Sequence, residues 1–131
     1  ILAETVGSLV GTADLGNPHL VLVVDDLAAV DIGELGARYE ALYPQGINVE
    51  WVAVDLNKGN NLDMLVWERG AGVTQACGTG ATAAAFLAHE WGLVEQQVNV
   101  RMPGGEVQVV ANEHPLLIGR TDYVASIELS T

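Results

Sequence analysis

The sequence contains one cysteine, few basic residues and no long hydrophobic run, and each shortage excludes a class of protein. Cys77 is the only cysteine in 131 residues, so an internal disulfide is excluded. The three histidines, at positions 19, 89 and 114, form no paired metal-ligand spacing, so we expect no metal. Five Lys and Arg against 17 Asp and Glu give a net charge of -12. Nucleic acids and anionic membranes need a cationic surface, so the expected partner is a small molecule.

The hydrophobic composition predicts one soluble domain over residues 1–131. Half of the residues are apolar, which at this length suffices for a core. No apolar run approaches the roughly 18 residues that a membrane span requires. The first residues also lack the basic flank and apolar run of a signal peptide. We therefore expect a cytoplasmic protein.

The hydrophobic pattern predicts an α+β domain of about eight mostly antiparallel strands and two helices. The first helix follows Asp31 as N-cap and Glu34 at the capping-box position, and the second runs from about Thr79 to Trp91 before Gly92. The second helix is rich in alanine and has almost no polar face, so we expect the strands to wrap around it. The expected strands are 6–10, 20–24, 48–56, 61–69, 98–102, 106–111, 116–120 and 122–129, and the third and fourth form a hairpin.

The stretch QACGTGATAAA, residues 75–85, places the only cysteine at the start of the second helix. A helix N-terminus offers unpaired N–H groups and a positive dipole end, and glycines at 78 and 80 open it to an anion such as a carboxylate. The dipole favours the thiolate of Cys77, so we expect a lowered pKa, a more reactive thiol and fast labelling near neutral pH. The alternative is an inert buried cysteine beside a tight strand-to-helix turn.

Glu68 and Arg69 end the second strand of the hairpin, eight residues before the thiol. Arginine suits bidentate carboxylate recognition, so Arg69 and the helix N-terminus are expected to hold a ligand carboxylate from two directions. Glu68 is a candidate for binding an ammonium group or assisting proton transfer. The alternative for both residues is a surface ion pair.

Four segments together resemble diaminopimelate epimerase, in the order in which that family has them. They are GNPHLV, INVEW, VWERGAGVTQACGTGATAAA and MPGGEVQV. The resemblance covers nearly the whole chain but only the C-terminal half of that enzyme. It implies one half of a two-half fold, in which each half wraps strands around a central helix and the active site lies between the halves.

The resemblance also implies roles for individual residues and no cofactor. Cys77 corresponds to one member of a two-cysteine acid/base pair, with Glu68 and His19 as catalytic residues that support the thiols. The implied substrate-binding positions are Asn17, Asn48, Arg69, Gly78 and Thr79. The implied reaction interconverts LL- and meso-diaminopimelate in lysine biosynthesis.

One thiol is too few for an inversion that needs a base on one face of the α-carbon and an acid on the other. We therefore expect a partner, either the missing N-terminal half or a second copy of this chain. Two alternatives stay open: a related racemase, since proline racemase also has a Cys-Gly-Thr-Gly segment, and a non-catalytic carboxylate-binding or interaction module. The segments GNPH and ERG favour diaminopimelate.

Overall fold

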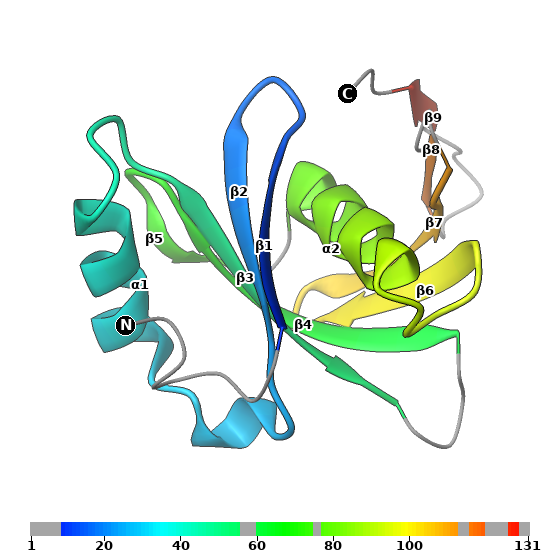
Figure 1. Ribbon diagram of the computed structural model, residues 1–131, viewed down its shortest axis with the longest axis horizontal. Coiled ribbons are helices and arrows are strands. Elements are labelled where there is room, and N and C mark those ends of the chain that lie inside the picture. The colour runs from blue at the N-terminus through cyan, green and yellow to red at the C-terminus, as the bar shows by residue number, and fades with distance from the viewer. Residues whose placement is uncertain (1–8, 56–59, 75–76, 113–115, 120–125, 129–131) are drawn as a thin grey trace.

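The computed structural model describes residues 9–55, 60–74, 77–112, 116–119 and 126–128 (Figure 1). Within these ranges it contains nine strands, two α-helices and one 3-10 helix. The strands are β1 (Leu9–Asp14), β2 (Pro18–Val23), β3 (Asn48–Val54), β4 (Asn61–Glu68), β5 (Gly72–Thr74), β6 (Gln97–Met102), β7 (Gly105–Val110), β8 (Leu116–Gly119) and β9 (Ser126–Glu128). The helices are η2 (Leu27–Ala29), α1 (Ile32–Ala41) and α2 (Gly78–Glu90).

The strands form one mixed sheet in the order β1-β2-β3-β4-β6-β7-β8-β9, with β5 paired to β4. Two neighbouring pairs are parallel, β2 with β3 and β4 with β6, and the others are antiparallel. The predicted α+β class and mostly antiparallel sheet are confirmed. Strand β5 was not predicted, because three residues that begin with a glycine show no alternation of polar and apolar side chains. The first strand also runs further than predicted, so the turn before β2 contains only residues 15–17.

The two α-helices cover opposite faces of the sheet, and each face has its own core (Figure 1). Because side chains alternate along a strand, β3 sends Val49 and Trp51 to the α1 face, and Glu50 and Val52 to the α2 face. This two-sided cover explains why residues 48–52 of β3 are all buried. The α1-side core is Leu20, Leu22, Val24, Tyr39, Ile47, Val49 and Trp51.

Helix α2 packs against strands β1 to β4 and β6 to β8, as the prediction of a helix surrounded by strands requires. Its alanines at 81, 83, 84, 85 and 88 are fully buried, and their small side chains let the strands approach closely. The helix ends at Glu90, and Gly92 follows with a positive φ of 77°, the left-handed conformation that glycine adopts readily.

Helix α1 begins at the predicted N-cap. Asp31 Oδ1 accepts the backbone N–H of Glu34 at 3.2 Å, which satisfies one of the donors left free at a helix start. The helix ends at Ala41, three residues before Pro44. No helix in the described part of the chain is long and apolar enough to cross a membrane.

Candidate functional site

The predicted site residues come from elements that meet at one end of the sheet. Strands β2 and β3 are parallel and start together, with His19 opposite Asn48. Strand β4 runs antiparallel to β3, so its last residues lie beside the start of β3. The first turn of α2 packs against the same end, where a Cβ atom added to Gly80 would lie 2.9 Å from Glu50 Oε2 and 3.2 Å from Cys77 Sγ.

Cys77 is the N-cap residue of α2. Its Sγ accepts the backbone N–H of Gly80 at 3.3 Å and lies 3.6 Å from Thr79 Oγ1. Ala81 N–H donates the first helical bond to the Cys77 carbonyl oxygen at 2.9 Å. The N–H groups of Gly78 and Thr79 precede that bond and have no backbone partner among the described residues, so they can donate to an anion, as expected at a helix N-terminus.

The thiol itself differs from the prediction of a lowered pKa. Burial raises the pKa of Cys77 above its ordinary value, and the carboxyl groups of Glu50 and Glu68 raise it further. The bonds from the Thr79 hydroxyl and the Gly80 N–H lower the pKa, but burial outweighs them. The sequence shows the helix N-terminus but neither the burial of the thiol nor the carboxyl groups packed beside it, so the expected lowering of the Cys77 pKa is not found, and slow labelling near neutral pH replaces fast labelling as the expectation.

We expect alkylation of Cys77 by iodoacetamide to be slower at pH 7 than alkylation of a free cysteine, and to rise with pH through a midpoint above the ordinary thiol pKa. The physical reason is that only the thiolate reacts, and the raised pKa reduces its fraction at neutral pH. Rates measured by mass spectrometry across pH, with the urea-unfolded chain as control, test this. The prediction is contradicted if the alkylation rate of the folded chain has its pH midpoint at or below that of the unfolded chain.

His19 and Glu50 form a buried pair beneath the start of α2, and both side chains are fully buried. His19 Nδ1 lies 3.1 Å from Glu50 Oε1 and 3.0 Å from Oε2. The position of Glu50 raises the pKa of its carboxyl group, because the effect of burial exceeds the opposing effect of His19. We did not predict a role for Glu50 from the sequence. The available signal was a carboxyl group in the middle of the apolar strand NVEWVAV.

The two asparagines at this end of the sheet are both bonded within the protein. Asn17 Oδ1 lies 3.2 Å from His19 Nε2. Asn48 donates from Nδ2 to the Pro18 carbonyl oxygen at 3.1 Å and accepts the Arg69 backbone N–H through Oδ1 at 2.7 Å. Asn48 thus joins the starts of β2 and β3 to the end of β4.

Glu68 and Arg69 point to opposite faces of the sheet. Glu68 lies on the α2 face, where its charge acts on both Cys77 and Glu50. The Arg69 side chain crosses Gly46, and its Nη1 donates to the Gln45 carbonyl oxygen at 3.2 Å. The structure therefore brings Glu68 to the thiol and places the Arg69 guanidinium on the α1 side of the same end.

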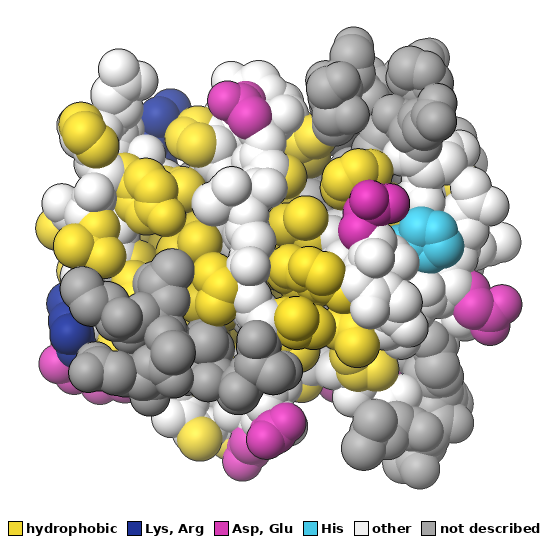
Figure 2. Space-filling model, viewed as in Figure 1, with side chains coloured by type: hydrophobic (Ala, Val, Ile, Leu, Met, Phe, Trp, Pro, Cys, Tyr) yellow, Lys and Arg dark blue, Asp and Glu magenta, His cyan; other side chains and the backbone are white. Residues whose placement is uncertain are grey.

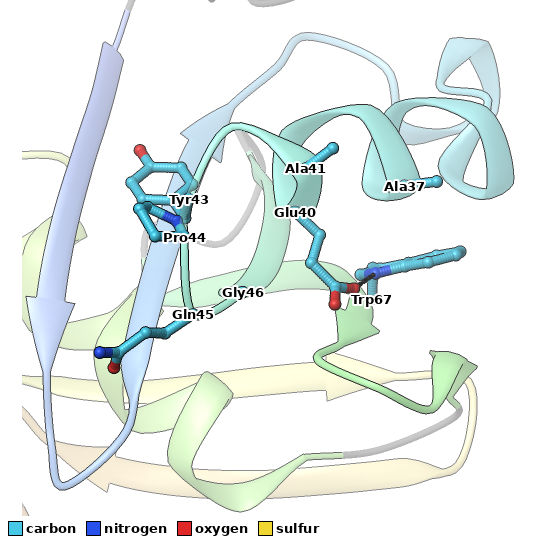
Figure 3. A pocket seen from close by; sticks show the side chains of 8 residues that line it. All are labelled: Ala37, Glu40, Ala41, Tyr43, Pro44, Gln45, Gly46 and Trp67. Atoms are coloured by element: carbon cyan, nitrogen blue, oxygen red, sulfur yellow. Dashed lines mark hydrogen bonds between the residues drawn. The ribbon is translucent and has the colours of Figure 1, made fainter.

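A pocket of about 680 Å³ lies on the α1 side, between the end of that helix and β4 (Figure 3). Figure 3 shows the Glu40 carboxyl group turned toward the Trp67 indole, whose Nε1 donates to Glu40 Oε1 at 2.8 Å. The pocket is lined by Ala37, Glu40, Ala41, Tyr43, Pro44, Gln45, Gly46 and Trp67. Cys77 packs against the core on the other face, so this pocket does not contain the thiol.

Comparison with known sequences identifies one family. The profile of the family described as "Diaminopimelate epimerase" matches residues 11–123. The diaminopimelate epimerase of Zymomonas mobilis is 43% identical over 115 residues, which are 85% of this chain and 42% of that protein. The diaminopimelate epimerase of Sphingopyxis alaskensis is 45% identical over 98 residues, which are 73% of this chain and 36% of that protein. The chain thus spans about two fifths of the length of these relatives.

Comparison with solved structures identifies the same kind of fold in proteins of low sequence identity. A phenazine biosynthesis PhzC/PhzF protein from Clostridium difficile superposes with a TM-score of 0.62 at 16% identity, over 83% of this chain and 41% of that one. A PhzF-family protein from Enterococcus faecalis gives a TM-score of 0.59 at 16% identity, over 77% and 36%. At this identity the likeness concerns the fold alone.

Proposed function

Since the chain belongs to the diaminopimelate epimerase family, we propose that residues 1–131 form the C-terminal catalytic half of a cytoplasmic enzyme that interconverts LL- and meso-diaminopimelate without a cofactor. The observation that carries the proposal is the thiol of Cys77 at a helix N-terminus, beside two backbone N–H groups that have no backbone partner in the described part of the chain. A carboxylate bound to the N–H groups of Gly78 and Thr79 would bring its own α-carbon next to Sγ.

Cys77 supplies one of the two proton-transfer groups. Its raised pKa keeps the group protonated at neutral pH, so in this chain it fits the proton donor to the α-carbon better than the base. In the reverse direction the thiolate takes the proton back. As a proton leaves the α-carbon, negative charge develops toward the bound carboxylate, and the N–H groups of Gly78 and Thr79 stabilise it.

The polar residues around the thiol are proposed to assist proton transfer, bind the substrate and position the backbone. Glu68 shares the α2 face with Cys77 and assists its proton transfer. Arg69 and Asn17 bind the polar groups of the substrate at the open end of the sheet. Asn48 contributes by fixing the backbone of Arg69, because both ends of its side chain are bonded to strand backbone.

The second proton-transfer group has to come from outside these 131 residues, because the sequence contains one cysteine. An N-terminal half like that of the longer relatives is the first candidate, and a second copy of the chain is the other. Figure 2 shows hydrophobic side chains across the middle of the molecule in the view of Figure 1. They are at most partly exposed, since Leu42 is the only exposed large hydrophobic residue in the described part of the chain.

Proton NMR of LL-diaminopimelate in D2O tests the proposal, with the chain alone and with an N-terminal half taken from the Zymomonas mobilis relative. We expect α-proton exchange and the meso isomer only when the halves are combined. Inversion by the chain alone would mean that two copies assemble the site. Diaminopimelate binding without exchange in the combined sample would leave a carboxylate-binding module, and turnover of proline instead would favour the related racemase.

A further inference from the structure

Glu50 is a buried ionisable group that the proposed reaction does not use. It lies in the centre of β3 with both oxygens against His19 Nδ1, and the backbone of Gly80 covers it from the α2 side. A buried ion pair is weak evidence for stability, because an apolar pair of similar volume is often neutral or stabilising in its place. A different reason for its presence is found in what His19 contacts next.

The contacts of His19 bear on where its protons are. The Asn17 amide is placed with Oδ1 3.2 Å from Nε2, and in this placement Nε2 carries a hydrogen, since an amide oxygen only accepts. Nδ1 faces the two oxygens of Glu50. If Nδ1 carried no hydrogen and Glu50 were ionised, the ring nitrogen and the carboxylate oxygens would face each other as acceptors with no proton between them. The negative charge of Glu50 would then be buried without compensation. With a hydrogen on Nε2, one further proton between Nδ1 and Glu50 makes the buried pair neutral as a whole and avoids this cost.

We propose that Glu50 is a positioning residue that holds His19 with Nε2 protonated, and that His19 thereby fixes the Asn17 amide with its NH2 group as a donor to an acidic group of the ligand. Among the described residues no partner occurs for Asn17 Nδ2, so this donor is available. Without the proton on Nε2, the amide would turn and present its oxygen, which repels a carboxylate. This inference rests on the proposed function in one respect, that Asn17 contacts the ligand.

The proton placement is tested without activity, by 15N NMR of the His19 ring and 13C NMR of the Glu50 carboxyl group at pH 7. We expect a hydrogen on Nε2, together with either a protonated Nδ1 beside a carboxylate or a bare Nδ1 beside a carboxylic acid. A bare Nε2 with a protonated Nδ1, the arrangement of an ordinary neutral histidine beside a carboxylate, overturns the proposal.

The effect on the ligand is tested in the enzyme assembled with an N-terminal half. Glu50→Gln can still donate an amide N–H to Nδ1, whereas Glu50→Leu cannot bond to the ring at all. We expect Glu50→Leu to raise KM for diaminopimelate by about tenfold or more, which corresponds to the loss of one hydrogen bond to a charged group. We expect Glu50→Gln to raise KM by less than about threefold. The matched control is Glu90→Gln at the exposed end of α2, which should change nothing.

A second variant tests the Asn17 donor directly if Glu50→Leu does not fold. Asn17→Asp retains an acceptor for Nε2 but removes the donor, so we expect KM to rise at least as much while the His19 ring keeps its hydrogen on Nε2. The proposal is overturned if Asn17→Asp leaves KM unchanged, or if Glu50→Gln and Glu50→Leu raise KM equally. An assembled wild-type enzyme without activity instead refutes the proposed function, and the NMR result on His19 then decides the proton placement by itself.

Discussion

Replacing Cys77 with serine is expected to slow α-proton exchange in the assembled enzyme by about 10²- to 10⁴-fold, the usual contribution of a positioned acid or base. Serine is similar in size, but its hydroxyl is a far weaker acid than a thiol and cannot take part in the proton transfer at neutral pH. Exchange of the α-proton of diaminopimelate in D2O, followed by NMR, measures the loss directly.

The same variant separates chemistry from folding. Cys77 is the N-cap of α2 and accepts the Gly80 N–H, and serine is among the preferred N-cap residues. The free energy of unfolding of Cys77→Ser should therefore stay within about 1 kcal/mol of wild type, whereas Cys77→Ala loses the cap as well and should cost about 0.5 to 2 kcal/mol. Full exchange activity in the serine variant would remove Cys77 from the reaction.

Replacing Gly36 with alanine is expected to destabilise the domain by about 1 to 3 kcal/mol, as overpacking of a filled site does. A Cβ atom at Gly36 would overlap the Trp67 ring at Cδ2, and the indole cannot move away without losing its bond to Glu40. The cost exceeds the gain of up to about 1 kcal/mol that alanine normally brings to a helix. Urea unfolding measures the change.

Gly33 in the same helix is the matched control. A Cβ atom there meets only Asp31 Oδ1, at 3.9 Å, which is ordinary contact. Gly33→Ala should therefore stabilise the domain by about 0.5 to 1 kcal/mol through helix propensity. If both alanine variants change stability in the same direction, the close packing of α1 on Trp67 is not what requires Gly36.

Local signals predicted most of the fold. Helix α1 was found because Asp31 and the apolar spacing after it mark a start and a face within a few residues. Helix α2 was found because its run of alanines indicates a buried helix and Gly92 marks its end. The hairpin of β3 and β4 has alternating apolar residues around a glycine-containing loop. Strand β5 had no such signal, and its position depends on pairing with β4, which is a contact between segments and not a property of three residues.

The position of Cys77 in the fold was predicted from the sequence, but its electrostatic surroundings were not. The alanine-rich pattern and the glycines placed Cys77 at the start of α2, where the structure has it as the N-cap. This pattern could not predict the pKa of the thiol, because burial and the positions of Glu50 and Glu68 beside Sγ depend on how β3 and β4 pack against α2. The opposite orientation of Glu68 and Arg69 follows from strand alternation, and we overlooked it in expecting Arg69 beside the helix N-terminus. A carboxyl group within an apolar strand was the one signal for Glu50.

The side chain of Asn48 has a consequence for motion at this end of the sheet. It bonds the backbone of Pro18 and of Arg69, so three strand ends separate only if both of these bonds break together. Local opening here should therefore be cooperative, and fraying of one strand alone is suppressed. A substrate that binds at this edge, as proposed, would meet a frame whose geometry is set before binding, so less conformational entropy would be lost when the complex forms.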